Sequence, residues 1–358
     1  MTLTRPFEFF VQLHLTERCN LRCKHCYQTG RTMDEMSFFE IKEAVTEISD
    51  TLAEWESVYG IRYSKSFNVT GGEPFLRNDI FDIIREIKDR GFGLYLLTNG
   101  IFVDEKKAKV LSDLNVNGVQ VSIEGPEEVH DSIRGKGSYS VSMKGVRYLL
   151  DAGLNVTMNV TLSSMNADYF MDIIDIAMRK GVQRLGFSRL VPSGRGGSML
   201  KEILSHERIG QLYNKIFSLN TGSLEIVTGD PVAAQSLVEE GEDRGDIPSG
   251  GCAAGVSGIT ILPDGGLVPC RRLDISLGNI RKDSFREIWA VSKVLEDIRS
   301  REKYKGKCRT CKRWAHCRGC RAIAYAFSKA RGANDFLAED PQCFVDLPYV
   351  LNDRKITI

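Results

Sequence analysis

The chain has 358 residues, of which 42% are hydrophobic and 27% are charged, as in ordinary globular proteins. Its 48 basic and 47 acidic residues nearly cancel, which argues against a nucleic-acid partner and against binding to an anionic membrane surface. No apolar run approaches the roughly 18 residues that a membrane helix needs, and the N-terminus lacks the features of a signal peptide. We therefore expect the 10 cysteines to be reduced thiols in a cytoplasmic protein, available to metals.

The first predicted strand, at residues 9–15, leads into a loop that carries three of these cysteines. Cys19, Cys23 and Cys26 have the spacing C-x3-C-x2-C, and no other Cys or His occurs between residues 27 and 129. A zinc knuckle is the alternative, but zinc usually takes a second pair of Cys or His ligands close by. Three thiolates without a fourth can instead hold a 4Fe–4S cluster and leave one iron free for a small molecule.

Helices and strands alternate beyond this loop. Helical periodicity covers residues 37–59, 79–90, 104–114, 140–152 and 168–180, and Ser37 with Glu40 forms a capping box at the first of these. Strand-like runs separate the helices at residues 66–70, 93–98, 118–123, 154–161 and 183–190. The alternation predicts an α/β fold, a parallel sheet covered by helices, with six strand–helix units up to about residue 205.

Candidate ligand-binding residues follow the predicted strands, where parallel β/α folds place their chemistry. The GGEP motif at residues 71–74 ends the second strand; its glycines let the backbone approach a ligand, and Glu73 can accept an ammonium group. Ser122 ends the fourth strand and Asn159 lies on the fifth, although a structural strand asparagine is the alternative for Asn159. Arg134 suits a carboxylate ligand, or else it forms a structural ion pair.

The second half of the chain holds the remaining seven cysteines. Before them, residues 206–250 are predicted to form a helix and an acidic, glycine-containing connector. Four of the cysteines, between Cys308 and Cys320, have the spacing C-x2-C-x5-C-x2-C, for which a zinc ribbon is the alternative. A zinc ribbon would leave Cys252, Cys270 and Cys343 without a role, which favours a larger iron–sulfur module.

The cysteine loop, followed about 45 residues later by GGEP, resembles the signature of radical S-adenosylmethionine enzymes, with His25 at a usually aromatic position. The later cysteines resemble the SPASM extension of that family, except that only Arg318 and Gly319 separate two cysteines where three residues are usual. The resemblance implies a partial (β/α)6 TIM-like barrel followed by a cysteine-rich SPASM domain. We expect the barrel in residues 1–205, the helix and connector in 206–250, and the SPASM domain in 251–358.

The resemblance also implies three 4Fe–4S clusters and S-adenosylmethionine. One cluster would bind the cofactor and use Cys19, Cys23 and Cys26. The first auxiliary cluster would use Cys308, Cys311, Cys317 and Cys343. The second would use Cys252, Cys270 and Cys320 and lack a fourth cysteine. The expected cofactor contacts are His25, Gly71, Gly72, Glu73, Pro74, Ser122, Arg134 and Asn159, and no residue is assigned as catalytic.

The reaction expected from the resemblance is anaerobic and oxidative. The reduced cluster cleaves S-adenosylmethionine, and the resulting 5′-deoxyadenosyl radical abstracts hydrogen from substrate, with electrons supplied by a donor such as flavodoxin or ferredoxin. The first hypothesis is maturation of a ribosomally made peptide or a protein side chain, with a separate partner binding any leader segment. The alternative is tetrapyrrole modification in a haem pathway, such as propionate decarboxylation.

Overall fold

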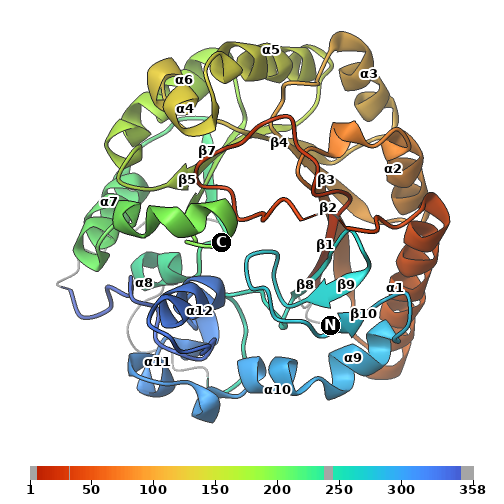
Figure 1. The fold of residues 1–358 in the computed structure, drawn as a ribbon, viewed down its shortest axis with the longest axis vertical. Coiled ribbons are helices and arrows are strands. Elements are labelled where there is room, and N and C mark those ends of the chain that lie inside the picture. Colours follow the sequence, from red (N-terminus) through yellow and green to blue (C-terminus); the bar gives the residue numbers. More distant parts are fainter. Residues whose placement is uncertain (1–5, 32, 238–244, 348–358) are drawn as a thin grey trace.

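The computed structural model describes residues 6–31, 33–237 and 245–347. Within them, one sheet has the strand order β10-β9-β8-β1-β2-β3-β4-β5-β6-β7, and Figure 1 shows the helices around its outer side. The strands are β1 (Phe7–His14), β2 (Tyr63–Thr70), β3 (Gly93–Thr98), β4 (Gly118–Ser122), β5 (Val156–Leu162), β6 (Arg184–Arg189), β7 (Glu225–Thr228), β8 (Gly258–Ile261), β9 (Gly266–Val268) and β10 (Gly278–Asn279).

Seven of the described helices follow strands of the barrel, and five others belong to the C-terminal third of the chain or lead into it. The first group is α1 (Phe38–Tyr59), α2 (Ile80–Asp89), α3 (Glu105–Asp113), α4 (Glu127–Arg134), α5 (Ser138–Asp151), α6 (Phe170–Lys180) and α7 (His206–Ser218). The second group is α8 (Ala234–Leu237), α9 (Phe285–Val291), α10 (Lys293–Arg299), α11 (Lys307–Thr310) and α12 (Arg321–Ala330). No helix in the described ranges is long and apolar enough to cross a bilayer.

The predicted barrel is confirmed, since β1 to β6 pair in parallel and in chain order. The capping box at the start of α1 is confirmed as well: the Ser37 amide donates to Glu40 (2.7 Å), and the Glu40 amide donates to the Ser37 hydroxyl (3.3 Å). The helix ends at Gly60, whose φ of 64° favours glycine.

Side chains along the barrel strands alternate between two environments. On β5, Val156, Met158 and Val160 are fully buried against the helices. Between them, Thr157 and Asn159 face the inside of the barrel, where they line a cavity. Thr157 and Asn159 thereby add polar surface to a cavity inside the barrel whose lining also includes apolar side chains such as Tyr95 and Leu97.

Four strands, β7, β8, β9 and β10, extend the sheet beyond the six that were predicted. β7 lies within residues 206–250, predicted as a helix and connector, and pairs in parallel with β6. β8, from the cysteine-rich region, pairs in parallel with β1 on the other side. Sequence analysis missed β7 because the strand has only four residues, and these do not alternate between polar and apolar. All four are half-buried, so neither face of the strand needs to be apolar. One sheet therefore runs across the expected boundaries at residues 205 and 250, and the division into domains stays a prediction.

Aromatic packing also joins the C-terminal region to the barrel. The ring of Phe9 on β1 lies 5.1 Å from that of Trp289 and 6.2 Å from that of Phe285, both on α9. Trp55 of α1 completes the cluster, 6.0 Å from Phe285. Such edge-to-face contacts add to the burial of apolar surface, so α9 covers the outside of β1 as part of the same core.

A buried ion cluster makes a second connection. Arg189, the last residue of β6, donates to Asp230 (Nε to Oδ2, 2.7 Å) and to Asp340 (Nη2 to Oδ2, 2.8 Å). Its Nη1 also reaches the Gln342 side chain at 3.0 Å, and the Tyr213 hydroxyl donates to Asp230 at 2.6 Å. Arg189 and both carboxylates are buried. Burial alone would lower the pKa of Arg189, but the two carboxylates hold it well above its ordinary value. The guanidinium thereby ties β6 to the C-terminal tail.

Replacing Arg189 with Met should destabilise the protein by about 3–5 kcal/mol, because two buried carboxylates would lose their counter-charge. The matched control is Arg184→Met on the same strand, whose pair with Glu225 is exposed (45% and 38% of the two side chains) and contributes below about 1 kcal/mol. Anaerobic urea unfolding followed by circular dichroism checks this. Equal midpoints for the two variants would contradict a structural role for the cluster.

Candidate active site

The cysteine loop after β1 is clamped by the glycines of the GGEP motif. The Gly72 amide donates to the Thr16 carbonyl (2.6 Å), and the Glu73 amide donates to the Arg18 carbonyl (2.9 Å). A Cβ atom on Gly72 would lie 2.1 Å from the Arg18 carbonyl oxygen, so only glycine permits this approach. The paired glycines thus bring the end of β2 against the loop.

The other end of the loop is held by the segment after β6. The Gly196 amide donates to the Cys26 carbonyl (2.9 Å), and a Cβ on Gly194 would lie 2.1 Å from the Tyr27 carbonyl oxygen. Gly194 also has a φ of 56°, which favours glycine. In the middle of the loop, the Lys24 amide donates to Ile133 of α4 (2.9 Å). The loop is therefore fixed at both ends before any ligand binds.

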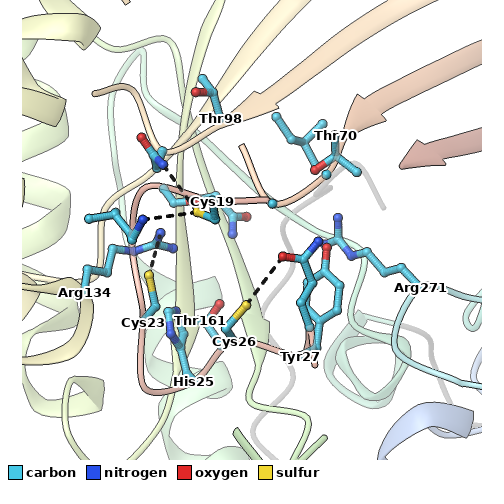
Figure 2. A pocket seen from close by; sticks show the side chains of 18 of the residues that line it. Cys19, Cys23, His25, Cys26, Tyr27, Thr70, Thr98, Arg134, Thr161 and Arg271 are labelled. Atoms are coloured by element: carbon cyan, nitrogen blue, oxygen red, sulfur yellow. Dashed lines mark hydrogen bonds between the residues drawn. The ribbon is translucent and has the colours of Figure 1, made fainter. Parts of the chain in front are cut away.

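Cys19, Cys23 and Cys26 line one cavity, with about 920 Å³ of empty space, at the C-terminal ends of the barrel strands. Figure 2 shows the three side chains around this space, with Arg134 and Arg271 on opposite sides. The described ranges contain no group of three or more His, Cys, Asp or Glu side chains that could bind a single metal ion. Thiolates of a multi-iron cluster bind different irons and need not converge on one point, so a three-cysteine loop facing a cavity fits such a cluster.

Most of the predicted cofactor contacts line the same cavity. They are His25, Gly71, Gly72, Ser122, Arg134 and Asn159. Ser122 on β4 and Asn159 on β5 are paired in register, so the strand alternation does bring both to one rim. Glu73 and Pro74 are not among the lining residues that the structure describes; Glu73 is fully buried behind the wall.

Glu73 holds the end of β3 in place. Its Oε1 accepts from the Thr98 hydroxyl (2.8 Å) and its Oε2 from the Asn99 amide (2.9 Å). Burial raises the pKa of Glu73 to about 7, against the opposing effect of these hydrogen bonds. The described residues supply no cation in an ion pair with this carboxylate, which would therefore gain from a positively charged ligand.

Glu124 joins three parts of the site. Its Oε1 accepts from the Arg134 guanidinium (Nε, 2.9 Å) and lies 2.9 Å from His25 Nε2; its Oε2 accepts from the Thr161 amide (2.8 Å). Burial alone would raise the pKa of Glu124, but Arg134 and His25 hold it well below its usual range. Arg134 thus forms the structural ion pair that the sequence left open, and its Nη1 also lies 3.8 Å from Cys23 Sγ.

Sequence analysis missed Glu124 and two arginines of the cavity wall, Arg271 and Arg272. Glu124 could have been recognised from the sequence, because it lies two residues after the end of β4, where parallel β/α folds place their functional residues. Arg271 and Arg272 offered none beyond their position after Cys270. Their approach to the barrel depends on the packing of segments far apart in the chain.

The auxiliary cysteines fall into the two sets expected from the resemblance. Cys308, Cys311, Cys317 and Cys343 line one cavity of about 310 Å³, where Gln235 Nε2 lies 3.3 Å from Cys343 Sγ. Cys252, Cys270 and Cys320 line a different cavity, with about 1470 Å³ of empty space, which extends through the barrel interior. This larger cavity meets the first at shared lining residues: Leu97, Gln120, Asn159, Ser188, Arg271 and Arg272.

Comparisons with known proteins agree with this geometry. The sequence signature of the radical SAM superfamily matches residues 13–177, and that of the SPASM iron–sulfur cluster-binding domain matches residues 252–312. The chain is 31% identical over 347 residues to the AdoMet-dependent heme synthase of Nitratidesulfovibrio vulgaris, covering 93% of this chain and 91% of that protein.

Two further similarities are more distant. The chain is 28% identical over 322 residues to the mycofactocin maturase MftC of Mycolicibacterium smegmatis, covering 87% of this chain and 77% of that protein. The structure of Streptococcus suis SuiB bound to S-adenosylmethionine matches with a TM-score of 0.70 at 16% identity, over 94% of this chain and 75% of that one. The chain belongs to the radical S-adenosylmethionine superfamily, as a TIM-like barrel enzyme with a C-terminal SPASM domain.

Proposed function

We propose that this enzyme modifies a tetrapyrrole of a haem pathway by decarboxylating a propionate side chain. The similarity that carries the proposal is to a protein named AdoMet-dependent heme synthase, over nearly the full length of both chains. When bound, the reduced cluster and S-adenosylmethionine supply a 5′-deoxyadenosyl radical that takes one hydrogen atom from an unactivated carbon. Loss of a hydrogen atom to this radical and of one electron to an acceptor, which a cluster held by Cys252, Cys270 and Cys320 would supply, leaves a vinyl group and carbon dioxide.

The chain's own residues bind and orient the reactants. Cys19, Cys23 and Cys26 would hold the cofactor's cluster on a loop already clamped by its glycine neighbours. Ser122 and Asn159 offer a hydroxyl and an amide at the rim, where the polar parts of S-adenosylmethionine would bind. Glu73, buried behind the cavity wall without an ion-pair partner among the described residues, would attract the cofactor's ammonium group across that wall.

Binding of S-adenosylmethionine should weaken about tenfold between pH 7.5 and pH 6, because Glu73, with a pKa near 7, must be ionised to attract the ammonium. The isosteric, uncharged Glu73→Gln should bind more weakly at pH 7.5 and lose this part of the pH dependence. Equilibrium dialysis with the anaerobically reconstituted protein measures both. Equal affinity and an equal pH profile in the variant would rule out this role for Glu73.

We propose one cluster on each of the three cysteine sets, which gives about twelve irons per reconstituted chain. Replacing Cys19, Cys23 and Cys26 together with Ala should lower the content to about eight, because the two other sets lie in separate cavities. Iron and sulfide analysis checks the count. Stoichiometric zinc on the Cys308–Cys320 quartet after anaerobic purification would contradict it.

The function is tested by incubating the reduced enzyme and S-adenosylmethionine with iron coproporphyrin, whose pyrrole rings carry propionates. Mass spectrometry should show loss of carbon dioxide plus H₂ per propionate, with 5′-deoxyadenosine formed alongside. Cys270→Ala should still cleave S-adenosylmethionine but lose tetrapyrrole product, because only the cysteine set beside the larger cavity is broken. Cleavage of the cofactor without any change in the tetrapyrrole would overturn the proposed substrate.

A second candidate is the first hypothesis, peptide maturation. It is supported by the similarity to mycofactocin maturase, which is weaker than the similarity to the heme synthase. In the same assay this candidate predicts an unchanged tetrapyrrole and 5′-deoxyadenosine formation that increases when a precursor peptide is added.

A further inference from the structure

Charge is distributed unevenly around the two connected cavities. Among their described lining residues there is no Asp or Glu, whereas five arginines are present. Three of the five have partners: Arg134 pairs with Glu124, Arg184 pairs with Glu225, and Arg195 donates to the Cys23 carbonyl (3.4 Å). The remaining two, Arg271 and Arg272, lie where the cavities meet.

Neither of these two guanidinium groups has a hydrogen bond or an ion pair within the described part of the chain. The Nε atom of Arg272 is buried without a partner. Arg271 lies over the ring of Tyr27, 5.4 Å from its centre, on the side of the cavity opposite Arg134 (Figure 2). Both follow Cys270 directly, in a segment whose bridge between Cys270 and Leu273 holds the backbone.

Both arginines are half-buried, and a guanidinium partly withdrawn from water gains from an anion or from several acceptors that compensate its lost hydration. Its planar donors match a carboxylate, which can bind in a bidentate manner. Elsewhere in its lining, the larger cavity presents apolar surface from Phe10, Tyr95 and Ile259. A flat apolar ligand with carboxylate side chains would satisfy both features.

We propose that Arg271 and Arg272 form a carboxylate-binding subsite, which holds a propionate of the tetrapyrrole at the junction between the cofactor cavity and the cavity of Cys252, Cys270 and Cys320. The inference rests on the proposed function and specifies how its substrate is recognised. The two arginines are adjacent in sequence and line both cavities, so one side chain can hold a carboxylate while the other faces the same ligand.

The test is equilibrium binding of coproporphyrin and of its propionamide analogue, in which every carboxylate is a neutral amide. Arg271→Gln and Arg272→Gln should each weaken binding of the acid by roughly 10- to 100-fold, because a charged hydrogen-bonding partner is lost. Binding of the amide should not change. Arg271→Lys and Arg272→Lys, which keep the charge, should recover part of the affinity for the acid.

Arg184→Gln is the matched control, because Arg184 lines the larger cavity but is already paired with Glu225 (2.6 Å). It should bind the acid as the wild type does. Iron content and S-adenosylmethionine binding are measured for every variant, so that loss of a cluster or of the cofactor is recognised.

Each other outcome overturns the subsite in a distinguishable way. If the wild type binds acid and amide alike, and the Gln variants match it, the subsite is wrong while the tetrapyrrole proposal stands. If Arg272→Gln alters only iron content or cofactor binding, the arginines serve the cysteines or the cofactor. If the wild type binds neither probe, the proposed function fails, and the subsite fails with it.

Discussion

The arrangement of this protein depends on the buried ion cluster centred on Arg189. One guanidinium satisfies Asp230 after β7 and Asp340 in the C-terminal tail, 151 residues away from it in the chain. Asp340 in turn accepts from the Cys320 amide (2.8 Å). Because the charges are buried, each group needs the others, and the barrel strand and the tail can adopt only a narrow range of relative positions. That constraint places Cys320 beside the barrel interior.

The same constraint gives the molecule a continuous interior. The polar and apolar side chains at the inward positions of the barrel strands do not fill the barrel centre, so the cavity of the three-cysteine loop joins that of Cys252, Cys270 and Cys320. A substrate in this space would lie between two cysteine sets. The third set, around Cys343, lies in a separate small cavity. This geometry suits a reaction in which a radical forms at the wall that carries the three-cysteine loop. An electron would then pass to the opposite side, where Cys252, Cys270 and Cys320 lie.

Charge distinguishes the candidate substrates more clearly than shape does. A cavity whose described lining has no carboxylate, and whose Arg271 and Arg272 have no ion pair among the described residues, attracts anionic side chains, which a tetrapyrrole carries as propionates and a peptide carries only at particular residues. Figure 2 shows that Arg271 and Arg134 lie on opposite sides of the cysteine loop. Arg134 is already neutralised by Glu124. Arg271 and Arg272, which have no ion pair among the described residues, lie where the cavity of the cysteine loop meets that of Cys252, Cys270 and Cys320.

The sequence by itself determined what depends on neighbours in the chain: the cysteine spacings, the strand–helix alternation and the Ser37 capping box, since each is set by local periodicity or local hydrogen bonding. The tertiary structure decided what depends on long-range packing. It placed Glu73 behind the cavity wall, extended the sheet with β7 on one side and β8, β9 and β10 on the other, and brought Arg271 to the barrel mouth. Such contacts follow from which buried surfaces and charges meet, and no periodic pattern in the chain encodes that.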